Sequence, residues 1–127
     1  MRTRPSIQHI SAITLAVRDM TRSIAFYETL GFEVFYGGRS SGFCSLRAGE
    51  AVVNLATTGE GYHAGLWGRV IFRVLDVDAQ YRALVAQGLE TEAPRDAAWG
   101  ERFFHVRDPD GHELSFAAPL EGPVVGE

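Results

Sequence analysis

The chain has 127 residues, 46% hydrophobic and 22% charged, the size and composition of one globular domain with its own core. All twelve basic residues are arginine, which excludes Schiff-base chemistry and a lysine general base. The net charge is −4 and the arginines are scattered along the chain, a distribution that argues against a nucleic-acid partner.

The first half of the chain predicts a strand, a helix and three further strands. Apolar residues alternate with small or polar ones over residues 13–17, as in a strand that buries one face. Asp19 is suited to cap a helix over residues 20–30, because a short carboxylate accepts from the free N–H groups of the first turn. Gly31 suits the left-handed position that ends such a helix. Strand-like runs follow at residues 33–36, 43–47 and 51–56.

The second half repeats this order. The sequence VIFRVLD at residues 70–76 resembles ITLAVRD at residues 13–19, 57 positions earlier. Asp76, or Asp78, can cap a second helix over residues 77–87, which ends at Gly88. Further strand-like runs lie at residues 90–91, 102–107 and 113–117. The shared order and spacing indicate two copies of one unit.

These elements predict an α+β fold made of two tandem βαβββ modules. We place the first module at about residues 7–58 and the second at about residues 66–118, in a single domain over residues 1–127. Residues 119–127 form a tail without periodicity that we expect to fray. Each helix covers one face of its sheet, so the other face needs a cover. Two sheets that face each other form a partly open mixed-sheet barrel, whose concave interior suits a small ligand.

Two further features have structural interpretations. Residues 108–111 (DPDG) lie between the last two strands and predict a tight hairpin turn. A calcium-binding EF-hand loop would need a bidentate glutamate at its twelfth position. The single cysteine, Cys44, permits no disulfide within the chain and alternates with Leu46 in a strand. It therefore predicts a buried apolar side chain rather than a nucleophile.

Three segments resemble the vicinal oxygen chelate superfamily, which contains the glyoxalases, bleomycin-resistance proteins and extradiol dioxygenases. They are residues 14–19 (TLAVRD), residues 23–27 (SIAFY) with residues 30–32 (LGF), and residues 99–103 (WGERF) running into residues 107–112 (RDPDGH). The resemblance extends over residues 7–118 and implies the glyoxalase/bleomycin-resistance fold. It does not specify a substrate, because this family includes both metal-dependent enzymes and metal-free drug-binding proteins.

The same resemblance implies where a metal would be held, since family enzymes bind one divalent ion with a ligand from each of four strands. The corresponding positions in this chain are Ala12, Asn54, Arg69 and Ser115. Alanine has no donor atom, asparagine and serine are weak neutral ligands, and a guanidinium repels a cation. His9 and His112 have the opposite strand parity, so we expect them to point away from the cup. We predict that the protein binds no metal and no other cofactor.

The candidate ligand-binding residues face the interior of the cup or form its wall. They are Arg69, His105, Asn54, Ser115, Glu113, Arg73, Trp99, Trp67, Phe43 and Phe35, with Phe103 as a further wall residue. A guanidinium at position 69 can hold an anionic or carbonyl oxygen by forked hydrogen bonds, and aromatic side chains can stack on a planar ligand. The alternative for Arg73 is a structural ion pair with Glu113.

Three functions are compatible with this sequence. The sequence does not establish which residues would be catalytic. The first is a metal-free protein that binds or sequesters a small aromatic or polar ligand, as in antibiotic resistance. The second is an enzyme of the same superfamily, a lyase, isomerase or dioxygenase. It is either metal-independent, with Arg69 stabilising an oxyanion while His105 or Glu113 moves a proton, or metal-dependent with atypical ligands. The third is a regulatory or degenerate domain whose own side chains fill the cup.

Partners and location follow from the same features. No segment approaches the roughly 20 apolar residues that cross a bilayer, and no secretory cleavage pattern follows the N-terminal arginines. We therefore expect a cytoplasmic protein with a small-molecule ligand and no membrane or nucleic-acid partner. Because two-module members of this family commonly pair, we also expect a twofold homodimer. Whether each cup lies within one chain or between two is left open.

Overall fold

The structure is a computed structural model that describes residues 4–59 and 61–120. Within these residues it has two helices and eight strands, arranged as two four-stranded sheets. The elements are β1 (Ile13–Val17), α1 (Met20–Leu30), β2 (Glu33–Gly37), β3 (Phe43–Ala48), β4 (Ala51–Thr57), β5 (Arg69–Arg73), α2 (Val77–Ala86), β6 (Arg95–Asp96), β7 (Glu101–Arg107) and β8 (Glu113–Pro119).

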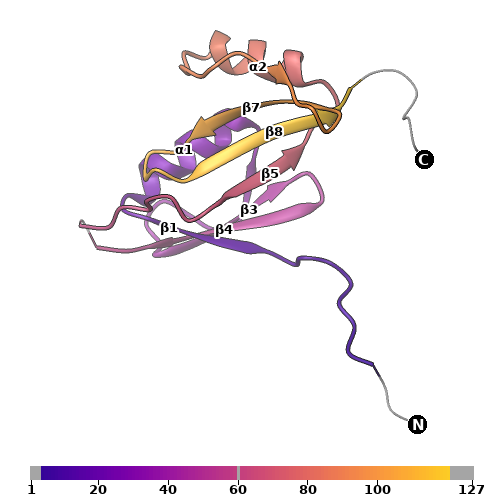
Figure 1. Ribbon diagram of the computed structural model, residues 1–127. Helices are drawn as coiled ribbons and strands as arrows, with labels where there is room; N and C mark the ends of the chain where they lie inside the picture. The colour runs from indigo at the N-terminus through magenta and orange to yellow at the C-terminus, as the bar shows by residue number, and fades with distance from the viewer. Residues whose placement is uncertain (1–3, 60, 121–127) are drawn as a thin grey trace.

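The two sheets have the same topology. The first has the strand order β1-β4-β3-β2 and the second has the order β5-β8-β7-β6. In each, the first strand of the module pairs in parallel with the last, and the other pairs are antiparallel. Figure 1 shows the first sheet below the second, with α2 above β7 and β8. The α+β fold of two tandem βαβββ modules with open, mixed sheets is therefore confirmed.

The helix boundaries follow from the capping residues that the sequence predicts. The carboxylate of Asp19 accepts from the backbone N–H of Arg22, and that of Asp76 accepts from Ala79, each at 3.0 Å. After the two helices, Gly31 and Gly88 have positive φ angles of 109° and 93°. In this region a side chain would meet its own backbone, so glycine ends both helices at low cost.

One predicted strand is displaced. Residues 90–91 were expected to pair with the rest of the second sheet, but the edge strand β6 lies at Arg95–Asp96. The hydroxyl of Thr91 donates to the carbonyl oxygen of His105 at 2.6 Å, so a side chain rather than the backbone holds this segment against β7. Pro94 has no N–H to donate to a neighbouring strand, and backbone pairing begins only after it.

The hydrophobic core lies on the helix-covered faces of the two sheets. α1 packs on β2 and β4, and α2 packs on β7 and β8. The two halves of the core meet where the ring of Phe32 lies 5.1 Å from that of Phe72, which in turn contacts Phe116 at 5.9 Å. Cys44 is completely buried in this core, and burial raises the pKa of its thiol, which confirms its prediction as a buried side chain.

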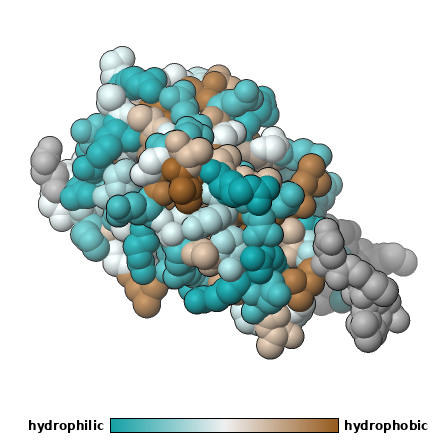
Figure 2. Space-filling view, turned by 90° about the horizontal axis from the view of Figure 1, so that it is seen from above, coloured by the Kyte–Doolittle hydropathy of each residue, from teal (hydrophilic) through white to brown (hydrophobic). Residues whose placement is uncertain are grey.

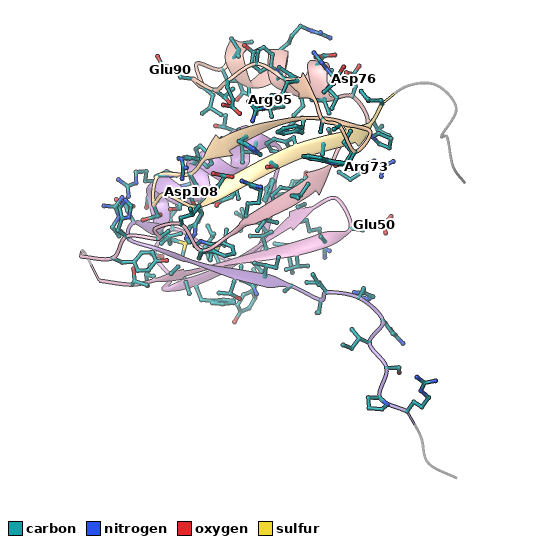
Figure 3. The ribbon with its side chains drawn as sticks, in the orientation of Figure 1. Glu50, Arg73, Asp76, Glu90, Arg95 and Asp108 are labelled. Atoms are coloured by element: carbon teal, nitrogen blue, oxygen red, sulfur yellow. The ribbon has the colours of Figure 1, made fainter. Side chains whose placement is uncertain are left out.

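The DPDG run forms the expected turn between β7 and β8, and it also joins the two modules. The fully buried carboxylate of Asp110 accepts from the backbone N–H and Nε of Arg18, both at 2.9 Å, and from the hydroxyl of Ser23 at 3.2 Å. Asp108, at the left-hand end of the second sheet in Figure 3, accepts from the hydroxyl of Tyr27 at 2.7 Å. Burial and then the Asp108 charge raise the pKa of Tyr27 far above its usual range, so this phenol remains a donor.

His112 extends this junction and faces away from the open side of its sheet, as its strand parity predicts. Its Nδ1 accepts from the indole Nε1 of Trp67 at 2.8 Å, and its Nε2 lies 2.8 Å from the carbonyl oxygen of Ala16. An indole N–H only donates and a carbonyl only accepts, so the two contacts together fit a ring that accepts at Nδ1 and donates from Nε2. His112 thus links the first strand of the first module to the segment that precedes β5.

The outer surface shows no single dominant hydrophobic face in the view from above. Figure 2 shows hydrophilic residues over most of that side, with hydrophobic ones in small separate groups. Among the described residues, no helix is both long and apolar enough to span a membrane. The second module exposes the hydrophobic side chains of Ile71 and Trp99.

Candidate functional site

A hollow of about 270 Å³ lies on the open face of the second sheet. Its residues come from β5, β6, β7 and β8 and from the loop before β7. Because side chains alternate along a strand, Arg69 and Ile71 share this face, as do Phe103 and His105. Ser115 lies beneath them on the central strand β8. All lining residues belong to the second module, so the hollow is formed by one sheet and its loop.

Arginine–glutamate pairs set the charge of this face. The Nε of Arg69 donates to Oε2 of Glu113, its direct cross-strand neighbour, while Arg107 binds the other carboxylate oxygen at 3.2 Å. Burial alone would raise the pKa of Glu113, but the hydrogen bond and charge of Arg69 outweigh it and lower that pKa. Glu113 is therefore a carboxylate that two guanidinium groups share, rather than a proton donor at neutral pH.

His105 lies opposite Ser115 in the β7–β8 ladder, and its Nδ1 is within hydrogen-bonding distance of the Ser115 hydroxyl. Burial lowers the pKa of His105, and the positive charge of Arg69 adds to this effect, whereas the carboxylate of Glu113 opposes it. The imidazole is consequently neutral near pH 7. The positive charge in the hollow comes from its arginines and not from this histidine.

An aromatic row crosses the hollow. The rings of Trp99 and Phe103 are stacked at a centroid distance of 5.9 Å and an interplanar angle of 23°, and Phe103 lies 5.1 Å from the ring of His105. The guanidinium carbon of Arg95 lies 5.0 Å from the Phe103 centroid. Trp99 is 71% exposed, and its indole N–H donates to Glu101 at 2.9 Å. The row therefore offers a flat apolar surface beside a cation.

The structure brings together four of the residues expected to bind a ligand. Arg69, His105, Ser115 and Trp99 all line the hollow, and Glu113 pairs with Arg69 at its edge. The structural ion pair suggested for Arg73 is not formed, since Glu113 binds Arg69 and Arg107 instead. Figure 3 shows Arg73 toward the right-hand end of the second sheet, where it lines a separate groove at the junction with the first module.

The other expected residues lie elsewhere. Asn54 is on the first sheet, where its side-chain oxygen accepts from Ser45 at 2.6 Å and its nitrogen donates to Thr14 at 3.2 Å. Phe35 and Phe43 are also on the first sheet, with Phe35 under a guanidinium at 4.2 Å. Trp67 donates to His112 behind the second sheet and does not line the hollow.

The four positions that correspond to metal ligands in the family separate into two pairs. Ala12 precedes β1 and Asn54 lies in β4, whereas Arg69 and Ser115 both face the hollow. This donor set does not fit a divalent cation, because one position lacks a donor and another holds a guanidinium already paired with Glu113. Over residues 4–59 and 61–120, no group of three or more His, Cys, Asp or Glu side chains is placed to hold an ion.

Sequence reasoning did not select three contributors to the hollow, Arg95, Glu101 and Ile71. Arg95 was overlooked because the edge strand was expected at residues 90–91, so the chain near position 95 had no predicted path. Glu101 has the same strand parity as Phe103 and His105, and this signal could have identified it. Ile71 was expected on the same face as Arg69 but was not selected as a site residue; it is 60% exposed there.

Comparison with known proteins agrees with this architecture. The family model described as Glyoxalase/Bleomycin resistance protein/Dioxygenase superfamily matches residues 6–116. A relative from Mycolicibacterium smegmatis, described as an uncharacterized protein, is 32% identical over 119 residues, which cover 91% of this chain and 98% of that protein.

Two solved structures show the same fold at lower identity. A glyoxalase/bleomycin resistance protein/dioxygenase from Nocardioides has a TM-score of 0.77 at 22% identity and covers 98% of this chain and 91% of its own. A bleomycin-binding protein complexed with bleomycin has a TM-score of 0.73 at 23% identity, covering 91% of this chain and 100% of its own. With its two βαβββ modules and its match over residues 6–116, the chain belongs to the glyoxalase/bleomycin resistance protein/dioxygenase superfamily.

Proposed function

We propose that the protein binds a small molecule in the hollow of the second sheet and holds it without chemical change. The observation that carries this proposal is the combination of an open hollow of about 270 Å³ with an exposed aromatic row and two arginines at one place. Ligand sites are concave and mostly apolar, with a few polar groups that fix orientation, and this hollow has that composition. Sequestration of an antibiotic-like compound is the role we infer.

A second candidate function is a metal-independent reaction in the same hollow. The contact between the neutral imidazole of His105 and the Ser115 hydroxyl, with Arg69 beside it, favours this candidate. A neutral histidine can accept a proton, and a guanidinium can stabilise an oxyanion. We prefer binding alone because Ser115 is 2% exposed and the Nε group of Arg69 is engaged by Glu113.

Ligand screening with one substitution tests the binding function. Thermal-shift and calorimetric measurements on a library of small aromatic and polar natural products should find a compound that stabilises the protein. Arg69→Gln should weaken its binding at least tenfold, because a charge-assisted hydrogen bond is worth about 1.5–3 kcal/mol. Mass spectrometry should recover the compound unchanged, whereas a product would favour the second candidate.

The matched control is Arg82→Gln, which removes an exposed arginine on α2 outside the hollow. This variant should bind the compound as the unmodified protein does. Circular dichroism should confirm that both variants are folded. If no compound in the library shifts the melting temperature, or if the two variants lose affinity equally, the hollow is not the binding site.

We also propose that two copies of the chain pair through the open faces of their sheets, with the hollows left open to the ligand between them. Ile71 and Trp99 are 60% and 71% exposed, and Thr14 on the first sheet is exposed as well. An aromatic and an aliphatic side chain of this exposure on one face are typical of an interface. Twofold pairing is the commonest symmetry among oligomers of one chain.

Sedimentation velocity tests this pairing. Twice the monomer mass of 13.9 kDa is expected at micromolar concentration. Thr14→Arg, which places a charge on the open face of the first sheet, should shift the protein toward the monomer. A monomer at every concentration, or a dimer that this substitution leaves intact, would show that these faces are not covered by a second copy.

A further inference from the structure

We infer that the ligand class of this hollow is a planar aromatic anion, such as an aromatic carboxylate of one or two rings. The inference rests on the proposed binding function and adds the charge and shape of the ligand. Three properties of the described residues support this ligand class: the charges that face the hollow, the aromatic row, and the available volume.

The charges that face the hollow favour an anion. The carboxylate of Glu113 is held by Arg69 and Arg107, and the one other carboxylate lining the hollow, Glu101, accepts the indole N–H of Trp99 and is set against two arginines, Arg69 and Arg95. Arg69 uses only its Nε in this pairing, and within residues 4–59 and 61–120 its two Nη groups have no hydrogen-bond partner. They are oriented by the Glu113 pair and are free to bind an oxygen.

Arg95 supplies the second positive group. Its nearest carboxylate is that of Glu92 at 3.8 Å, which is a weak, exposed pair, and its guanidinium lies over the ring of Phe103. The hollow therefore presents two incompletely satisfied guanidinium groups, although the whole chain carries a net charge of −4. A cationic ligand in the hollow would lie close to both groups and be repelled by them.

The aromatic row determines the shape of the ligand. Trp99 and Phe103 are stacked within 23° of parallel, so their rings present an extended flat surface. Ile71, which is 60% exposed, adds an aliphatic surface from the edge strand β5, on the other side of β8 from Phe103. A planar ring can cover this surface while an attached carboxylate reaches a guanidinium. A flexible aliphatic acid would satisfy the charge but leave the aromatic surface in water.

The volume limits the size of the ligand. Pockets for drug-sized molecules measure roughly 300–1,000 Å³, and this hollow, at about 270 Å³, is just below that range. One or two fused rings with a single acidic group therefore fit, and larger compounds do not fit within one sheet.

Three probes that share a naphthalene ring and carry a negative, a neutral or a positive substituent test the inference. They are 2-naphthoate, its neutral amide 2-naphthamide, and the cation 2-naphthylmethylammonium, measured by isothermal titration calorimetry on the full chain. We expect 2-naphthoate to bind at least tenfold more tightly than the amide, and the cation to bind more weakly than the amide. The advantage of the carboxylate should shrink as the salt concentration is raised, because screening weakens exposed charge pairs.

Two variants assign the effect to the residues named here. Arg95→Gln should weaken 2-naphthoate binding about tenfold and leave the affinity for the amide within twofold, because it removes charge but not the rings. Phe103→Leu should weaken both probes to a similar extent. Arg82→Gln, the same substitution on an exposed face of α2, should change neither affinity. Circular dichroism and melting temperature show whether each variant is folded.

The results separate this inference from the binding function on which it rests. If the three probes bind equally, or the cation binds best, or none of them binds, the ligand class is wrong. In those cases the natural-product screen still decides the binding function independently. If the screen finds a neutral or cationic compound whose affinity depends on Arg69, the binding function is supported. The assignment of the ligand as an anion is then wrong.

Discussion

Asp110→Ala is expected to lower the free energy of unfolding by about 3 kcal/mol, the lower end of the range for breaking a buried charge pair. The substitution removes the acceptor for the backbone N–H and Nε of Arg18 and for the hydroxyl of Ser23. Ser23 is fully buried, so its hydroxyl would have no water to replace the carboxylate. The lower end applies because the Arg18 side chain is 30% exposed and can regain part of its hydration.

Chemical denaturation with a matched control measures this effect. Asp96→Ala removes a carboxylate that is 57% exposed and pairs with Arg102 at 2.8 Å. Exposed pairs contribute about 0–1 kcal/mol, so this variant should remain close to the unmodified protein. Asp110→Asn, which keeps one oxygen acceptor without the charge, should fall between the two. Equal costs for Asp110→Ala and Asp96→Ala would contradict the role given to the buried turn.

Gly37→Ala is expected to destabilise the protein by about 2–5 kcal/mol. Gly37 has a φ of 73°, in the left-handed region where a side chain costs about 1–2 kcal/mol. An added Cβ would also lie 2.2 Å from the carbonyl oxygen of Phe43 and 2.9 Å from the Cα of Cys44. Both are backbone atoms of the paired strand β3, so relief requires moving that strand, and overpacking costs about 1–3 kcal/mol more.

Two other glycines in the first module separate these contributions. Gly49 has a φ of 62° with nothing within 4 Å of an added Cβ, so Gly49→Ala should show only the cost of the left-handed conformation. Gly38 is also unobstructed and does not have a positive φ, so Gly38→Ala should lie within about 0.5 kcal/mol of the unmodified protein. A Gly37→Ala variant no less stable than Gly49→Ala would show that β3 accommodates the methyl group.

The local features of the fold could be predicted from the sequence because local interactions produce them. Asp19 and Asp76 cap their helices through backbone groups three residues away, and Gly31 adopts the expected left-handed conformation. The strand faces were also predictable, since alternation alone sets which side chains meet the core. The strand expected at residues 90–91 was not found, because a hydroxyl contact from Thr91 replaced the backbone pairing that its sequence suggests.

The site could be predicted only where it lies within one sheet. Strand parity brings Arg69, His105 and Ser115 to one face, and the cross-strand register makes His105 and Ser115 direct neighbours. Parity does not determine how two sheets are placed relative to each other. For that reason Asn54 and Phe43, which share the open face of the first sheet, were expected beside a hollow that the second sheet forms alone.

The turn of residues 108–111 could also be predicted only in part. Its composition is sufficient to predict a turn, because aspartate, proline and glycine each favour one. Its partners Arg18, Ser23 and Tyr27 are more than 80 residues earlier in the chain, and nothing in the local sequence indicates them. Buried polar contacts of this length depend on the packing of the two modules.

The carboxylates of that turn join the two copies of the duplicated unit. Two copies of one unit could in principle melt as separate steps, as neighbouring units do in repeat proteins. Here the acceptors Asp108 and Asp110 belong to the second copy, and the side chains that donate to them belong to the first. Opening either copy alone would leave buried charge or buried hydroxyls without partners in the other. We therefore expect the two copies to unfold together in one cooperative step.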